Sequence, residues 1–142
     1  MNGTTVNQKF AYGIGAVYVL IGLLGFAVTG GLDFASPEGA SLLGFDVNPL
    51  HNIVHLALGA AWLIGARAGG MAARSANLAV GAVLLLVGVA GFLIDLESSV
   101  NILAIDMADN WLHLVSGLAS LGVAMYAARE TTTNRGRPAA GM

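Results

Sequence analysis

Four long apolar stretches of this chain contain no Lys, Arg or Glu in their interiors: about Phe10 to Thr29, Pro49 to Ala66, Ala76 to Ile94 and Asn110 to Ala128. Each approaches the ~20 residues that a helix needs to cross ~30 Å of hydrocarbon. Because lipid offers no hydrogen-bond partners, a spanning segment must pair its own backbone groups. The stretches exceed strand length and show no two-residue alternation. They predict an all-α bundle of four transmembrane helices.

The composition agrees with a membrane location. Of 142 residues, 56% are hydrophobic and only 10% are charged, with a mean hydropathy of +0.77. Such a chain cannot cover itself with enough polar surface to be a soluble globule. Lys9 before the first stretch is typical of a cleavable signal peptide, but the stretch is longer than the usual ~7 to 15 apolar residues. We therefore expect the first stretch to be a retained helix.

The charged residues predict the orientation. All six cations lie on one side of the predicted spans, and seven of the eight acids lie at or between the opposite ends: Lys9, Arg67, Arg74, Arg129, Arg135 and Arg137 against Asp33, Glu38, Asp46, Asp95, Glu97, Asp106 and Asp109. The positive-inside rule puts the cationic side in the cytoplasm. We expect a multi-pass protein of the bacterial inner (cytoplasmic) membrane with both termini cytoplasmic. Nothing in these charges indicates a nucleic-acid partner.

The chain contains an internal repeat. The segment His51 to Gly59 recurs 58 positions later as Asp109 to Gly117, and Gly15 to Phe26 recurs 66 positions later as Gly81 to Phe92. Each repeat holds two spans, so the two halves enter the membrane in the same direction. We expect one domain over residues 1–129, with repeats of about 10–66 and 76–129, and a disordered polar tail over 130–142.

Helix starts are marked in both repeats. Asn48 is a favourable N-cap followed by Pro49 in the first helical position, and Asp106 occupies the equivalent cap in the second repeat. Counting from these caps places His51 and Asp109 in the first turn. His55 and His113 then lie about one turn deeper, ~6 Å further along the helix axis.

All three histidines of the protein fall in these two segments and suggest a metal site. Residues four apart share a helix face, so facing helices would bring together three imidazoles and one carboxylate: His51, His55, Asp109 and His113. Such a set suits zinc, or copper if the arrangement is more tetragonal. A helix N-terminus disfavours imidazolium and leaves the rings free to act as ligands. Asn52, Asn110 and Asp95 are candidates for hydrogen-bonding to the ligands and so orienting them.

Two other interpretations remain open. The histidines can instead hydrogen-bond to loop carbonyls and to the neighbouring asparagines, and so hold the ends of the helices together. Alternatively, His55 and His113 could clasp a haem b, with Gly59 and Gly117 leaving room for it. Asp95 can likewise simply reach outer water beside Glu97.

The remaining features favour packing over catalysis. Two glycine sets provide small surfaces for close helix approach: Gly15, Gly22 and Gly25, and Gly81, Gly88 and Gly91. The chain has no cysteine, no nucleotide motif and no catalytic triad. Trp62 and Trp111, near span ends, fit interfacial anchors.

Paired Asn-x-x-His-Leu-x-x-Gly elements at Asn52 to Gly59 and Asn110 to Gly117, together with the four spans, resemble DUF4383, an actinobacterial membrane family of unknown function. The resemblance covers about Lys9 to Arg129 and implies a fold but no activity. The leading functional hypothesis is a non-enzymatic membrane protein, an accessory or assembly subunit of a larger inner-membrane complex or a homo-oligomer. The alternative is a metal- or haem-binding membrane protein.

Overall fold

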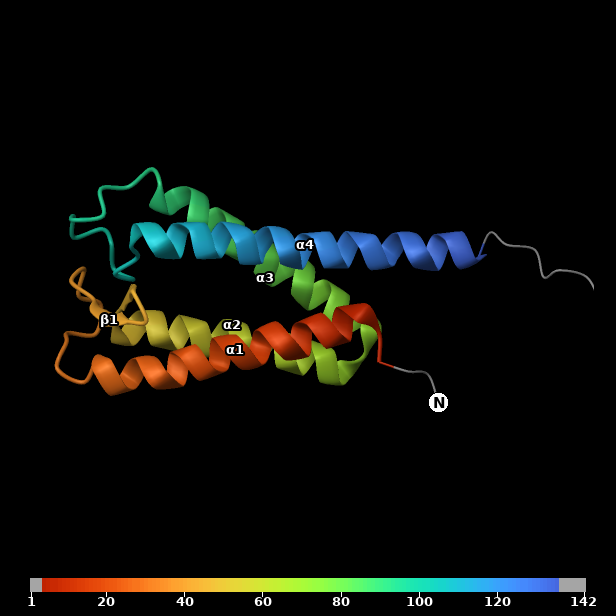
Figure 1. Ribbon diagram of the computed structural model, residues 1–142, viewed down its shortest axis with the longest axis horizontal. Helices are drawn as coiled ribbons and strands as arrows, with labels where there is room; N and C mark the ends of the chain where they lie inside the picture. The colour runs from red at the N-terminus through yellow and green to blue at the C-terminus, as the bar shows by residue number, and fades with distance from the viewer. Residues whose placement is uncertain (1–3, 136–142) are drawn as a thin grey trace, which may run out of the picture.

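The computed structural model describes residues 4–135 as four helices and one short hairpin (Figure 1). In chain order the elements are α1 Val6–Val28, β1 Ala40–Leu42, β2 Phe45–Val47, α2 Pro49–Ala68, α3 Gly70–Gly91 and α4 Met107–Arg135. The fold is all-α, as the sequence predicts, and each predicted span corresponds to one helix.

Three of these helices, α1, α2 and α3, are long and apolar enough to cross a membrane, judged by length and composition over the described residues. Large apolar side chains also point outward from the bundle, among them Leu20, Leu86 and Val115, which are 56%, 71% and 63% exposed. Outward apolar faces are expected where lipid replaces water as the surrounding medium. The chain is therefore a helical membrane protein with several candidate spans.

The helices pack as two pairs, α1 with α2 and α3 with α4, and α2 joins α3 directly (Figure 1). Only Gly69 interrupts the helices between these pairs, with a φ of +119° that a residue with a β-carbon would adopt only under strain. This connection and the start of α1 lie at one end of the bundle. The opposite end carries two loops, the first over residues 29–48 and the second over 92–106; we call it the loop end.

Both helix pairs make the same close contacts through glycine. A β-carbon built on Gly22 would lie 2.8 Å from the Asn52 carbonyl oxygen, and one built on Gly88 would lie 3.0 Å from the Asn110 carbonyl oxygen. The two contacts are equivalent: the glycines, in α1 and α3, are 66 positions apart, and the asparagines that they contact, in α2 and α4, are 58 positions apart. Further contacts follow these offsets: Gly15 with Gly59 and Gly81 with Gly117, Gly25 with Asn52 and Gly91 with Asn110.

Two side-chain hydrogen bonds are also related by offsets of 66 and 58 positions. They lie near the end of the bundle where α2 joins α3, which we call the connection end. Gln8 Nε2 donates to the Ala66 carbonyl oxygen at 2.9 Å, and Arg74 Nε donates to the Ala124 carbonyl oxygen at 3.0 Å. Each bond ties the first turns of one helix to the later turns of its partner. The two pairs therefore use equivalent positions at both ends.

Trp62 differs from its predicted role as an interfacial anchor. It is fully buried in a core that also contains Tyr18 and Leu84. Gly15 explains the burial, because a β-carbon on that glycine would lie 3.0 Å from the Trp62 β-carbon. The small residue lets α1 approach α2 closely enough to cover the indole, so the prediction for Trp62 is wrong.

Two local features were not predicted. The first loop contains an antiparallel hairpin in which Ala40 pairs with Val47, and Leu43 and Gly44 turn the chain with φ values of +57° and +91°. Positive φ at both central residues is typical of a tight hairpin turn. The second feature is the length of α4, which continues to Arg135 and so enters the predicted disordered tail of 130–142. Residues 136–142 of that tail lie outside the described part of the chain.

Replacing Thr29 with valine is expected to lower the free energy of unfolding by about 1 to 3 kcal/mol, the cost of an unsatisfied buried polar group. Thr29 is buried, and its hydroxyl accepts a hydrogen bond of 3.0 Å from Asn52 Nδ2. The Asn52 Oδ1 has no partner, so the valine variant leaves the buried amide with none. Chemical unfolding in detergent would measure the change. Thr29→Ser, which keeps the hydroxyl, should stay close to the parent; equal loss in both variants would contradict the role of this bond.

Candidate functional site

The first turns of α2 and α4 are held by the predicted caps. The Asn48 side chain accepts a 2.8 Å hydrogen bond from the His51 backbone amide, and Asp106 Oδ1 accepts a 2.7 Å bond from the Asp109 amide. Pro49 occupies the first helical position of α2. Both cap predictions are confirmed, and the caps place His51 and Asp109 in equivalent positions at the loop end.

The structure brings the three histidines together. His51 and His55 from α2 and His113 from α4 each offer a ring nitrogen, and these nitrogens all lie within 4.8 Å of one another. The ring centroids of His51 and His55 are 4.7 Å apart, and His113 lies 6.1 Å and 6.3 Å from them. All three side chains are at most 4% exposed. We call this group the histidine cluster.

Tyr18 of α1 closes one side of the histidine cluster. Its ring stacks on His55 with centroids 4.9 Å apart and an angle of 16° between the planes. Its hydroxyl forms a 2.9 Å hydrogen bond with Ser116 Oγ of α4, and its ring also contacts the edge of Trp62. Sequence reasoning missed Tyr18. One signal in the sequence could have pointed to Tyr18: the two repeats differ at this position, since the equivalent residue 66 positions later is Leu84.

The ring nitrogens of the histidine cluster have few hydrogen-bond partners. His51 Nε2 and His55 Nε2 lie 3.0 Å apart and can share one proton. The Nδ1 atoms of all three rings are buried without a hydrogen bond. Backbone groups of Asp46 and Leu103 lie close to His51, although His51 Nδ1 forms no standard hydrogen bond with them. Buried polar atoms in proteins nearly always have partners, so these orphaned nitrogens need an explanation.

The donor set and its spacing fit a single transition-metal ion. Imidazole nitrogen suits zinc, copper and nickel. At metal–nitrogen distances of 2.0 to 2.1 Å, two ligands are about 3.3 Å apart in a tetrahedral site and about 2.9 Å apart in adjacent positions of a square one. The observed 3.0 Å between His51 Nε2 and His55 Nε2 falls between these values. All three ligand nitrogens lie within 4.8 Å of one another, so the His113 ring must move closer to the other two for all three to bind one ion.

Asp109 lies outside the group that could hold an ion, although it is only 1% exposed. Its carboxylate turns back toward its own helix start, where Asp109 Oδ2 is 3.4 Å from the Asp106 backbone nitrogen. Together with the Asp106 cap this forms a reciprocal pair at the start of α4, which is the arrangement of a capping box. The structure thus assembles three of the four predicted ligands.

The three predicted supporting residues make no hydrogen bond to a histidine within the described part of the chain. Asn52 donates to Thr29, and both side-chain atoms of Asn110 are buried without a partner. Asp95 is exposed, and its carboxylate accepts a 3.1 Å bond from the Glu97 amide. The helix ends explain the asymmetry. α1 continues to Val28, whereas α3 ends at Gly91, three positions before the residue equivalent to Val28, so Asp95 does not occupy the place of Thr29.

A haem clasped between His55 and His113 would require neighbouring side chains to move. A haem needs its two axial rings on opposite sides of a flat macrocycle with space around both. His51 stands beside both rings, with centroids 4.7 Å from His55 and 6.1 Å from His113. Tyr18 covers His55 from α1.

Comparison with known proteins gives a family and no activity. Neither the curated proteins nor the solved structures contain a match to this chain. One family model matches most of the chain and reaches into all four helices, with the histidine cluster inside the match. It is the family that the paired Asn-x-x-His-Leu-x-x-Gly elements indicate. With residues 8–126 matched, the chain belongs to DUF4383, a family defined by a domain of unknown function.

Proposed function

We propose that this protein is a membrane metal-binding protein that holds one transition-metal ion, zinc or copper, on His51, His55 and His113. One observation carries the proposal: three buried imidazoles from two helices lie with their nitrogens within 4.8 Å of one another. Three protein nitrogens leave a fourth position for water or another small ligand, which is the coordination of open zinc sites.

A purely structural role for the histidines explains less of the geometry. In that role the histidines would bond to loop carbonyls and to the neighbouring asparagines. Backbone groups of both loops, at Asp46 and Leu103, do lie beside His51, but Asn52 and Asn110 make no hydrogen bond to a histidine in the described part of the chain. Within the cluster, a hydrogen bond joins His51 and His55 of the same helix, α2. His113 makes no such bond to either ring, and its buried Nδ1 has no partner. An ion would replace the proton that His51 Nε2 and His55 Nε2 can share and, with His113 as a third ligand, would link the two helices directly.

The proposed arrangement in the membrane has two parallel repeats of two spans, with both termini cytoplasmic and the ion near the outer face of a bacterial inner membrane. The glycine contacts that recur at offsets of 66 and 58 positions support the repeat. The positions of the cations and acids support the orientation. In this arrangement α4 is the fourth span.

An accessory or assembly role in a larger membrane complex stays a prediction. It is compatible with the proposed ion site, because a small bundle without soluble domains can hold an ion for a partner. The described residues do not single out a partner or a surface for one. The proposal therefore concerns the ion site and leaves the recipient open.

Elemental analysis of the detergent-purified protein tests the proposal. The protein should carry a purification tag without histidine and should be prepared without chelator. We expect about one zinc or copper ion per chain, either as purified or after dialysis against the metal salt, and no porphyrin absorption band. Protein that stays free of metal after dialysis would overturn the proposal and leave the histidines structural. A porphyrin band at stoichiometric intensity would replace the ion with haem.

A further inference from the structure

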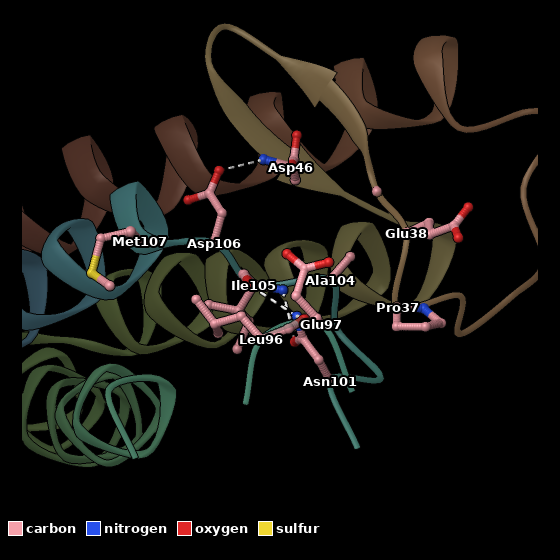
Figure 2. Close-up of a pocket in the computed structure, with 11 residues that line it drawn as sticks. Pro37, Glu38, Asp46, Leu96, Glu97, Asn101, Ala104, Ile105, Asp106 and Met107 are labelled. Carbon is pink, nitrogen blue, oxygen red and sulfur yellow. Dashed lines mark hydrogen bonds between the residues drawn. The ribbon is translucent and has the colours of Figure 1, made fainter. Parts of the chain in front are cut away.

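A pocket of about 540 Å³ opens at the loop end, between the first loop and the second (Figure 2). Four carboxylates from separate segments line it: Glu38 and Asp46 from the first loop, Glu97 and Asp106 from the second. No lysine or arginine is among its lining residues. A cleft lined by one sign of charge concentrates ions of the opposite sign, so this pocket attracts cations.

The inner wall of the pocket adjoins the histidine cluster. Asp106 Oδ2 accepts a 3.0 Å hydrogen bond from the Asp46 backbone nitrogen, drawn as the dashed line between these two labelled residues in Figure 2. The backbone of Asp46 in turn lies beside His51. The charge of Asp106 acts on both His51 and His113. None of the three histidines lines the pocket, but Asp46, which does, adjoins His51, whose Nδ1 is buried without a standard hydrogen bond.

The other directions around the histidine cluster are closed. Toward the connection end, Tyr18 and Trp62 are at most 3% exposed and stack or pack against one another and against His55. Laterally the helices pack through their glycines and turn apolar side chains outward. A hydrated ion cannot cross such a surface without losing its water. The loop end is the side on which polar groups line a path from the surface to the histidine cluster.

We propose that the ion reaches the histidine cluster through this acidic pocket, where Glu38 and Glu97 capture a hydrated divalent transition-metal cation before the imidazoles bind it. The inference rests on the proposed function and adds the route and the capturing residues. Both glutamates are exposed, whereas Asp46 and Asp106 are partly buried and joined by the hydrogen bond between the loops. Carboxylate oxygens can hold the cation with its water, and the nitrogens then replace that water as ligands.

The rate of metal loading tests the route separately from the ion site. Cobalt(II) is a suitable probe, because its binding to nitrogen ligands can be followed by visible absorption in stopped flow. We expect Glu38→Gln/Glu97→Gln to load about tenfold more slowly than the parent at low salt, within the 10- to 1,000-fold range of electrostatic steering. Raising the ionic strength should slow the parent more than the variant, since salt screens the attraction. The final number of cobalt ions per chain at saturation should not change.

The matched control is Asp33→Asn, which removes one exposed carboxylate in the first loop outside the pocket lining. It should load at the parental rate, whereas Glu38→Gln and Glu97→Gln should each slow loading by a few fold. If the double glutamine variant loads as fast as the parent, or if Asp33→Asn slows loading equally, the route is overturned while the ion site stands. A parent that binds no cobalt overturns both proposals.

Discussion

Zinc at 100 times its dissociation constant is expected to stabilise the parent protein by about 2.7 kcal/mol, because a ligand that binds only the folded state adds its binding free energy to folding. In the variant His55→Ala/His113→Ala this stabilisation should disappear. His55 and His113 contribute one ligand from each of the two helices, so their loss leaves only His51 of the cluster. The measurement is thermal unfolding in detergent with zinc and with chelator, for which a shift of roughly 5 to 10 °C is expected in the parent.

A control must separate loss of the ion from general damage to the bundle. Ser120→Ala serves this purpose, since Ser120 is fully buried in α4 and donates a 2.8 Å hydrogen bond to the Asn77 carbonyl oxygen, away from the cluster. This variant should melt at a lower temperature than the parent yet keep the full zinc response. A zinc response that survives in the double histidine variant would contradict the assignment of the ligands.

Replacing Gly59 with alanine is expected to lower the free energy of unfolding by about 1 to 3 kcal/mol, the usual cost of overpacking. A β-carbon there would lie 2.8 Å from the Gly15 carbonyl oxygen and 2.8 Å from the Val19 backbone nitrogen. Both atoms belong to the backbone of α1, which cannot move aside as a flexible side chain can. The helix itself must shift, and with it Tyr18, which stacks on His55.

Gly13→Ala is the matched comparison for this prediction. Gly13 lies within α1, and a β-carbon there would meet no atom within 4 Å. Alanine at such a position should be neutral or stabilise the helix by up to about 1 kcal/mol, because of its better helix propensity. Unfolding titrations of both variants in detergent would show the contrast. Equal stability of the two would indicate that close approach at Gly59 does not hold α1 against α2.

Much of the candidate site could be predicted because its signals are local. Asn48 and Asp106 are good N-caps by residue type, and the four-residue spacing of His51 and His55 puts both rings on one helix face. His113 follows from the repeat, since it stands 58 positions after His55. The three rings meet only if α2 and α4 face each other, which the sequence could only predict. The structure does bring the rings together.

The parts that the sequence left undecided or misjudged depend on contacts between elements. Asp109 has the spacing of a ligand, but its carboxylate returns to the backbone of Asp106. Trp62 has the sequence position of an interfacial anchor, but Gly15 admits it to the core. For Asp95 the sequence left two interpretations open, and the exposed position beside Glu97 is the one observed, because α3 ends early. In each case the packing of the helices and their ends, which the local sequence does not specify, decides what surrounds the side chain.

By itself, the sequence determined the all-α class, the caps, the apolar helices and the shared face of His51 and His55. These follow from residue type and helical periodicity, which act over a few neighbouring residues. Only the tertiary structure decided that His113 completes the cluster without Asp109, that Tyr18 covers His55, and that the two loops form an acidic pocket beside them. The reason is that a side chain's partner across helices depends on how closely the backbones approach, and here glycine contacts between helices set that approach.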